Sequence, residues 1–284
     1  MYGIRALDLI DIMIPIFNID IEIWDLALRL SRVRRFCAFI NKIYPGELVK
    51  MVTVRDLARE LFLSSEESAV VTEISRLDNV LKKNMSSIAH EIPHIDPEAS
   101  LAQVIDVMND LNLECVPIAR EEVFIGAVSE ESLIDNARNV IPLELRSSEI
   151  ATKNIETIDQ EAPVEEAIGL MLQRGFRRIP IKNSSDRVVG ILTLLDVVAA
   201  LADIYRISRE LRSIDILIAP LSQSRFVKKP IIVSPDTPVR DIIDQVLSSG
   251  VGCVLVGSGE EVQGIITEKD LVRTIKRYYS TILE

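Results

Sequence analysis

The chain has 284 residues, of which 48% are hydrophobic, enough to bury two ordinary domains or several small repeats that share a core. Its formal net charge of −11 argues against a nucleic-acid backbone as the main partner, because such binding draws its affinity from Lys and Arg. Cys37, Cys115 and Cys253 have apolar neighbours, which predicts buried thiols, no disulfide framework and a cytoplasmic location.

Residues 1 to 28 form the first apolar stretch and raise the question of a membrane segment. Four acidic residues interrupt it, namely Asp8, Asp11, Asp20 and Glu22, and a basic leader with a small-residue cleavage site is lacking. We therefore expect buried strand and helix here, with neither a transmembrane span nor a signal peptide, and no membrane partner.

A repeat organises the chain from residue 47 onwards. Each copy has an apolar strand that ends in Ser or Thr and is followed by an amphipathic helix. The copies are ELVKMVTVRDLARE (47–60), VFIGAVSEESLIDN (123–136), RVVGILTLLDVVAA (187–200) and VQGIITEKDLVRTI (262–275). A strand, turn, helix and strand precede the last three copies, in HIDPEASLAQVIDVMNDLNLECVPI (94–118), TIDQEAPVEEAIGLMLQRGFRRIPI (157–181) and IVSPDTPVRDIIDQVLSSGVGCVLV (232–256). Units of roughly 60 to 75 residues bury little core alone, so we expect them to pair.

The segment HEIPH, from His90 to His94, fits the H-E-x-x-H pattern of zinc peptidases. That pattern binds zinc only on a helix, where residues four apart bring two imidazoles to one face. Pro93 removes an amide donor and pushes Ile92 toward an extended conformation. We therefore expect the strand that opens the second repeat, with His94 aligned to Thr157 and Ile232, and no metal site.

These strand-to-helix motifs, with the segment FRRIPI, resemble tandem cystathionine-β-synthase-type (CBS) domains. The resemblance is strongest in the third and fourth copies and weakest in the first, where Lys50 replaces a glycine. The layout is similar to that of the γ subunit of AMP-activated protein kinase and of free-standing archaeal CBS proteins. It implies an α+β fold of four β-α-β-β-α units at residues 1–66, 67–145, 146–207 and 208–284. The units should pair as two Bateman modules, residues 1–145 and 146–284.

The resemblance also implies a function. Such proteins bind AMP, ADP or ATP in clefts between paired domains and act as non-catalytic energy sensors that regulate another protein. No catalytic cofactor is implied, and the chain is expected to be a monomer or a homodimer. Two alternatives stay open, an interaction scaffold with vestigial clefts and a protein that binds S-adenosylmethionine. An enzyme has little support, because no nucleophile with a plausible base is visible.

The most complete predicted site lies in the C-terminal pair. Asp270 can accept hydrogen bonds from both hydroxyls of a ribose, and Thr267 starts the helix that carries it. In the family, the partner domain supplies phosphate-binding side chains just before its strand, which here are Arg177 and Arg178. Two other interpretations remain: Thr-x-x-Asp also serves as a helix cap, and the arginines could lie on a solvated strand edge.

The opposite cleft has Thr193 and Asp196 but faces Gly252 and Cys253, so we expect it to lack a cation and to bind phosphate more weakly. The residues expected around the nucleotides are Ile155, Thr157 and Ile265 in the first cleft, and Ile191, Ile231 and Ile232 in the second. In the N-terminal pair, Lys50, Glu114 and Ser132 occupy the corresponding places. Ligand binding should therefore be concentrated in the C-terminal pair.

Overall fold

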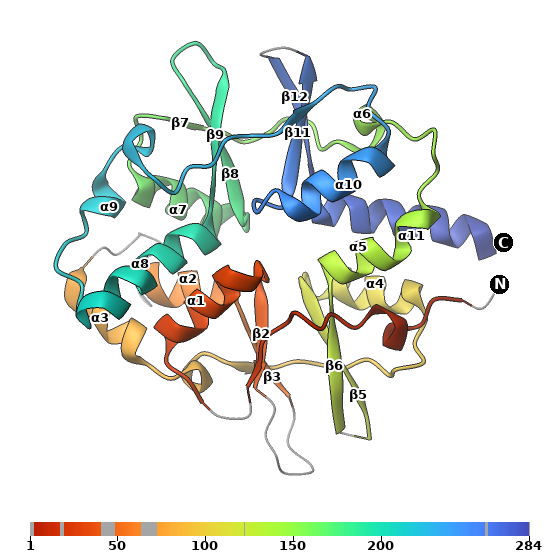
Figure 1. Cartoon of the computed structure of the whole chain (residues 1–284), viewed down its shortest axis with the longest axis horizontal. Helices are drawn as coiled ribbons and strands as arrows, with labels where there is room; N and C mark the ends of the chain where they lie inside the picture. The colour runs from red at the N-terminus through yellow and green to blue at the C-terminus, as the bar shows by residue number, and fades with distance from the viewer. Residues whose placement is uncertain are drawn as a thin grey trace.

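The repeats form a disc in which sheets lie at two opposite edges and helices fill the space between them (Figure 1). The computed structural model describes residues 3–17, 20–40, 49–63, 73–121, 123–258 and 261–283. Within these ranges the strands form four sheets, in the orders β1-β2-β3-β4, β5-β6, β7-β8-β9 and β10-β11-β12. The predicted α+β fold is therefore confirmed.

The helices and strands follow the repeat, with η marking a 3-10 helix. The N-terminal half contains η1 (Ala6–Leu9), β1 (Ile16–Phe17), α1 (Ile23–Val33), β2 (Cys37–Ile40), β3 (Lys50–Thr53), α2 (Val54–Phe62), α3 (Ile74–Lys82), η2 (Met85–Ser87), β4 (His90–Glu91), α4 (Leu101–Asp110), β5 (Cys115–Arg120), β6 (Val123–Ser129), α5 (Glu130–Ala137) and η3 (Arg138–Val140). The C-terminal half contains α6 (Ser147–Ile150), β7 (Ile158–Asp159), α7 (Val164–Arg174), β8 (Arg178–Lys182), β9 (Val188–Thr193), α8 (Leu194–Ser208), α9 (Asp215–Ile218), η4 (Leu221–Gln223), β10 (Ile232–Val233), α10 (Val239–Ser248), β11 (Cys253–Ser258), β12 (Glu261–Thr267) and α11 (Glu268–Leu283).

Each unit contains one pair of consecutive antiparallel strands, and the register of this pair is the same in all four units. The strand-ending hydroxyl residue faces the first residue of the preceding strand, in the pairs Cys37 with Thr53, Cys115 with Ser129, Arg178 with Thr193, and Cys253 with Thr267. All three cysteines therefore occupy one position of the repeat, and Arg178 occupies it in the third unit. This alignment also settles the region around Cys37, which is ambiguous in the sequence.

The segment HEIPH lies outside any helix, as expected. His90 belongs to β4, which pairs antiparallel with β3. The opening strands of the last three units align through the parallel pairs Ile95 with Ile118, Ile158 with Ile181, and Val233 with Val256. His94 therefore occupies the same position as Thr157 and Ile232, which the sequence alignment predicted.

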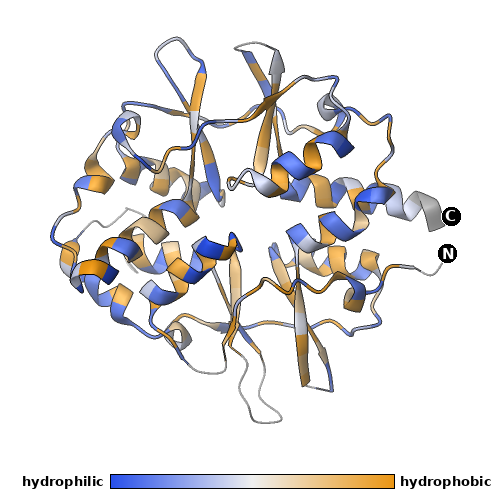
Figure 2. Ribbon diagram, viewed as in Figure 1, coloured by the Kyte–Doolittle hydropathy of each residue, from blue (hydrophilic) through white to orange (hydrophobic). Residues whose placement is uncertain are grey.

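Among the residues that the structure describes, four groups of buried apolar side chains hold the disc together, and the sheets in Figure 2 are correspondingly rich in hydrophobic residues. Two of the groups join sheet faces within a module: Cys37, Phe39 and Met51 pack with Cys115 and Ala127, and Ile191 with Ile265 in the other module. The two larger groups pack helices of the first unit against the third, and of the second against the fourth. The predicted pairing into two Bateman modules is confirmed, and the boundaries of the units stay a prediction.

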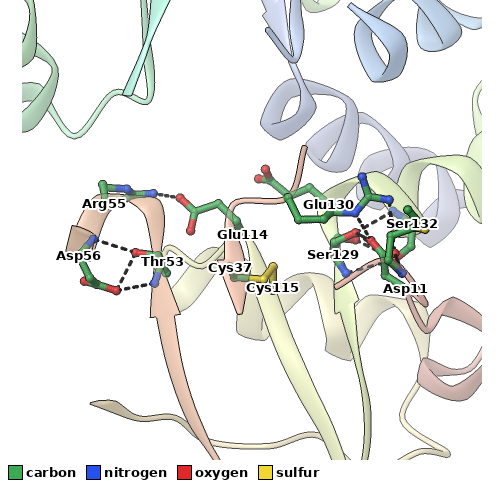
Figure 3. Close-up of a disulfide and its surroundings, with 12 residues drawn as sticks. Asp11, Cys37, Thr53, Arg55, Asp56, Glu114, Cys115, Ser129, Glu130 and Ser132 are labelled. Carbon is green, nitrogen blue, oxygen red and sulfur yellow. Dashed lines mark hydrogen bonds and ion pairs between the residues drawn. A yellow bond between two sulfur atoms is a disulfide. The ribbon is translucent and has the colours of Figure 1, made fainter. Parts of the chain in front are cut away.

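The expectation of three free thiols is wrong. Cys37 and Cys115 form a disulfide between β2 and β5, across a sequence separation of 78 residues (Figure 3). Cys253 is free and buried, and burial raises the pKa of its thiol to about 11. The apolar surroundings of the cysteines predicted their burial correctly, but they gave no sign that two of them meet at equivalent positions of paired units.

Candidate functional site

A cavity of about 440 Å³ between the third and fourth units is the candidate site, and residues of the first two units, such as Arg55 and Glu114, also line it. It brings together six of the residues that the sequence predicted for the first cleft, namely Ile155, Arg177, Arg178, Ile265, Thr267 and Asp270. Thr157 is half-buried and does not line it. The cavity has apolar walls, a carboxylate at the start of α11 and several cations, so it can accept a flat ring, a diol and an anion.

Asp270 is only 8% exposed, and both of its oxygens already accept hydrogen bonds. The backbone N–H and the hydroxyl of Thr267 donate to Oδ2 at 2.8 and 2.7 Å, which is the capping arrangement expected from the sequence. The hydroxyl of Thr152 donates to Oδ1 at 2.9 Å. An ionised carboxylate offers about four lone pairs, and these three bonds leave Asp270 the capacity to accept one further hydrogen bond, at Oδ1. Capping and ligand binding are therefore compatible at this residue.

Arg177 lies at the centre of a buried ion network, so it is not on a solvated strand edge. Its Nη2 lies 2.6 Å from Glu130 and 3.5 Å from Glu268, and its Nε lies 3.7 Å from Glu114. Burial alone would lower the pKa of this guanidinium, but the three carboxylates outweigh that effect and raise it. The Nη1 atom is buried and has no hydrogen-bond partner among the described residues.

Arg178 is also held by the protein. Its Nη2 lies 2.6 Å from Glu268, and its Nη1 donates to the carbonyl oxygen of Gly252. A Cβ atom at position 252 would lie 2.0 Å from Oε1 of Glu268 and 2.7 Å from Nη2 of Arg178. The glycine at this position is therefore explained by the space that the Arg178–Glu268 pair occupies, a relationship that the sequence does not reveal.

Four further cations line the cavity, namely Arg55, Arg174, Lys269 and Arg273, and sequence reasoning did not find them. Arg55 pairs with Glu114, and Lys269 donates to the side-chain oxygen of Asn112. Arg273 lies 3.9 Å from Asp270. Burial lowers the pKa of Lys269, and the nearby Arg273 and Arg55 lower it further. Arg55 and Lys269 both occupy the second position after the strand-ending threonine, a spacing that could have identified them.

The apolar residues that line the cavity include those predicted to enclose a flat ring. Ile155 and Ile265 are joined by Phe176 and Pro180 among the lining residues. Ile265 is 9% exposed and Phe176 is 40% exposed, so one wall is buried and another opens toward solvent. A ring bound there would bury apolar surface against aliphatic side chains without needing a hydrogen bond.

The opposite cleft differs from the prediction, because cations do reach its carboxylate. The hydroxyl of Thr193 donates to Asp196 at 2.7 Å, as expected for a helix cap. Asp196 also lies 2.8 Å from Nζ of Lys228 and 2.9 Å from Nη1 of Arg34, which comes from the first unit. Ile191 is fully buried in the apolar group between the two sheets, whereas Ile231 and Ile232 are partly exposed. None of these three residues lines the 440 Å³ cavity.

In the N-terminal module, the first unit keeps the threonine-aspartate motif and the second unit lacks its acid (Figure 3). Thr53 donates to Asp56 in the first unit, and Nδ1 of His90 lies 3.8 Å from Asp56. In the second unit, Asp11 accepts a hydrogen bond from the hydroxyl of Ser129 and lies 2.5 Å from Arg35. The acid missing from the second copy is therefore supplied by the chain's own N-terminal segment.

One position of the fold places a residue beside each of these helix starts. The backbone of Asp11, His90, Thr152 and Lys228 pairs with Ala127, Met51, Ile265 and Ile191 respectively, always two residues before the strand-ending Ser or Thr. In every case the segment that leads into one unit crosses onto its partner unit. This exchange explains how Thr152 reaches Asp270 although 118 residues separate them.

Over the described ranges, no helix is both long and apolar enough to cross a bilayer. In the same part of the chain, no group of three or more His, Cys, Asp or Glu side chains is placed to hold a metal ion.

Comparisons with known proteins agree with the repeat. A family model described as CBS domain matches residues 83–139, 148–203 and 225–277, which together are more than half of the chain. An uncharacterised protein from a ribosomal RNA operon of Thermofilum pendens is 25% identical over 248 residues, covering 82% of this chain and 78% of its own.

Two solved structures share the whole arrangement. A Methanocaldococcus jannaschii protein, described as a proposed archaeal homologue of g-AMPK, has a TM-score of 0.79 at 17% identity, covering 95% of this chain and 99% of its own. An uncharacterised conserved protein from Pyrococcus horikoshii has a TM-score of 0.58 at 12% identity, covering 96% of this chain and 100% of its own. At these identities the likeness concerns the fold.

Proposed function

The chain belongs to the CBS domain family, and we propose that it is a non-catalytic regulatory protein that binds an adenine nucleotide in the cavity between its third and fourth units. The observation that carries the proposal is the gathering of Asp270, Arg177, Ile155 and Ile265 around one cavity of about 440 Å³. The family resemblance supports an energy-sensing role, in which the bound nucleotide acts as a regulatory ligand for a partner protein.

Asp270 is the proposed ribose acceptor. Thr267 and Thr152 hold its two oxygens in place at 2.7 and 2.9 Å, so no conformational freedom is lost when a ligand arrives. Ile155 and Ile265 would enclose the adenine. Thr157, which the sequence placed at this site, is left out of the proposal because it does not line the cavity.

The phosphate is proposed to contact Nη1 of Arg177 together with Lys269. The first is a buried donor without a partner among the described residues, and the second is a partly buried cation with other cations around it. Arg178 is not proposed to contact the phosphate directly, because Glu268 and the carbonyl oxygen of Gly252 already bind its guanidinium.

The opposite cleft is proposed to bind nucleotide more weakly. Lys228 and Arg34 occupy one oxygen of Asp196, so a ribose there would have to compete with two ion pairs. Titration of the full chain should therefore give one tight site per chain.

Calorimetric titration with AMP, ADP, ATP, adenosine and S-adenosylmethionine tests the proposal. Asp270→Asn should weaken AMP and adenosine alike by about 10- to 100-fold, because it removes the charge of the carboxylate that accepts the hydrogen bond from the ribose. Lys269→Gln should weaken AMP by about 10-fold and leave adenosine unchanged. Asp56→Asn is the matched control, because Asp56 makes the same cap with Thr53 in the other module.

The alternatives give different outcomes. Binding of S-adenosylmethionine without AMP would identify the sulfonium ligand, and no binding of any of the five compounds would favour an interaction scaffold. A cytoplasmic location stays a prediction, and the Cys37–Cys115 disulfide removes the free-thiol argument on which it partly rested.

A further inference from the structure

A second cavity of about 440 Å³ forms a basic groove along α11. Its lining residues are Asn109 of α4 and, from α11, Lys269, Arg273, Lys276, Arg277 and Ser280. Four of these six carry a positive charge, and no acidic residue of the described chain lines the groove. This cluster of positive charge is unusual in a chain whose formal net charge is −11.

The groove follows one face of the helix. Lys269, Arg273, Lys276 and Ser280 are spaced three or four apart, Arg277 adjoins Lys276, and from Lys269 to Ser280 the helix rises about 16 Å. Helix α4 runs alongside in the opposite direction, because Lys269 contacts Asn112 and Lys276 pairs with Asp106. In Figure 1, α11 leads from the middle of the disc to its edge, so the groove leads outward.

The groove and the candidate nucleotide cavity are neighbours that share two lining residues. Lys269 and Arg273 line both of them, and Asn112 lies beside Lys269 at the junction. An anion seated against Lys269 in the first cavity therefore has further cations within reach along α11.

The balance of charge differs between the first cavity and the groove. Inside the first cavity, Glu114, Glu130 and Glu268 surround the guanidinium of Arg177. In the groove, Asp106 pairs with Lys276, Arg273 lies 3.9 Å from Asp270, and Lys269 donates to the neutral amide oxygen of Asn112. Burial lowers the pKa of Lys269, the charge of Glu130 opposes that shift, and Arg273 and Arg55 lower the pKa further because like charges repel. A bound polyanion would relieve that repulsion.

We propose that this groove binds the outer phosphates of the nucleotide, so that the site prefers ligands with an extended polyphosphate chain, such as ATP, over AMP. The inference rests on the proposed function of the first cavity. The base and ribose lie between the third and fourth units, and the phosphate chain leaves past Lys269 along Arg273, Lys276 and Arg277.

The test is a titration of the full-length protein with AMP, ATP and inorganic tripolyphosphate, in the presence of a chelator so that no divalent ion screens the phosphates. The variant is the double change Lys276→Gln and Arg277→Gln, which removes two charges outside the first cavity. The control is Arg206→Gln with Arg212→Gln, an equal loss of charge at exposed positions elsewhere on the disc. The wild type should bind ATP more tightly than AMP, and the groove variant should weaken ATP about 10-fold while AMP changes less than 2-fold.

Two outcomes would overturn the inference: equal weakening of AMP and ATP by the groove variant, or an ATP affinity that neither exceeds that of AMP nor responds to the variant. Tripolyphosphate separates this failure from failure of the proposed function. If no adenine compound binds but tripolyphosphate binds the wild type and is lost in the variant, the groove is a phosphate site and the adenine assignment is wrong. If AMP binds and tripolyphosphate does not, the nucleotide site stands and the groove proposal fails.

Discussion

Cys37 and Cys115 are bonded to each other at the position where the C-terminal module has Arg178 and Cys253. The N-terminal module is therefore closed by a covalent bond where the C-terminal module has a buried ion network beside a cavity. The repeat is conserved in geometry, while the chemistry at the module's centre differs between the two halves. This difference supports a ligand site in the C-terminal module alone.

The first prediction concerns this disulfide. It closes a loop across 78 residues, so the chain-entropy model gives a contribution of about 4 kcal/mol, and Cys37→Ser with Cys115→Ser should lower the Tm by about 10 °C. Thermal denaturation with and without a thiol reductant measures the effect. Cys253→Ser is the control and should still respond to reductant. Three reactive thiols in denatured, unreduced protein would contradict the disulfide.

The second prediction concerns Asp11, which the sequence presented only as an interruption of an apolar stretch. It is 6% exposed and binds Arg35 and Ser129. Asp11→Asn should destabilise the protein by about 3 kcal/mol, because it leaves a mostly buried guanidinium without its counter-charge. Asp8→Asn, in an exposed pair with Arg5, should cost less than about 0.5 kcal/mol. Urea denaturation compares the two variants, and similar midpoints would refute the assignment.

The third prediction is a dependence of stability on pH. Burial and the charge of Glu268 raise the pKa of Glu131 to about 8, and burial also raises that of Glu130. The folded state holds these protons more tightly than the unfolded chain, where such carboxyls have a pKa of about 4.3. The contribution of Glu131 is therefore complete below about pH 4.3 and is lost as the pH rises through about 8.

The Tm should accordingly fall by about 2 °C or more between pH 6 and pH 9. Glu131→Gln should reduce this fall, because an amide does not titrate in that range. Glu165→Gln, a change of the same kind in the first turn of α7, should leave the fall unchanged. A Tm profile of the Glu131 variant that matches the wild type would show that another group titrates.

The fourth prediction concerns the two modules as separate chains. Both large apolar groups contain helices from both halves, and Trp24 of α1 packs against Tyr205 of α8 at a ring distance of 6.3 Å. Residues 146–284 expressed alone would expose the buried faces of α8 and α11, so we expect them to associate. Light scattering after gel filtration should give a mass above that of one half. A monomeric half that unfolds cooperatively would contradict the shared core.

Much of the fold could be predicted because its signals are local. Apolar periodicity and the strand-ending Ser and Thr identified the repeat, and the cap of Thr267 with Asp270 forms as expected. Pro93 excluded a zinc-binding helix for the same reason, since a proline acts on its own backbone and its neighbour. The pairing of the units followed from their small size and from the family resemblance.

The contacts of the site could not be predicted in the same way. The sequence gave Arg177 and Arg178 a free role in phosphate binding, yet Glu130 and Glu268 hold them from other units at 2.6 Å. It assigned no cation to Asp196, and Lys228 and Arg34 reach it from a linker and from the opposite module. Each of these contacts depends on how the units pack against one another. The sequence pattern within one repeat carries no information about this packing.

The sequence by itself determined the repeat, its capped helices, the extended HEIPH segment and the positions that carry carboxylates and arginines, because hydrophobic period, capping and proline geometry act over a few residues. Only the tertiary structure decided which of those groups meet. The Cys37–Cys115 disulfide, the bond from Thr152 to Asp270 and the groove along α11 join residues far apart in the chain. Their energies depend on separations of a few ångströms that are fixed when four units pack around shared cores, and the same residues in isolated units would have no partners.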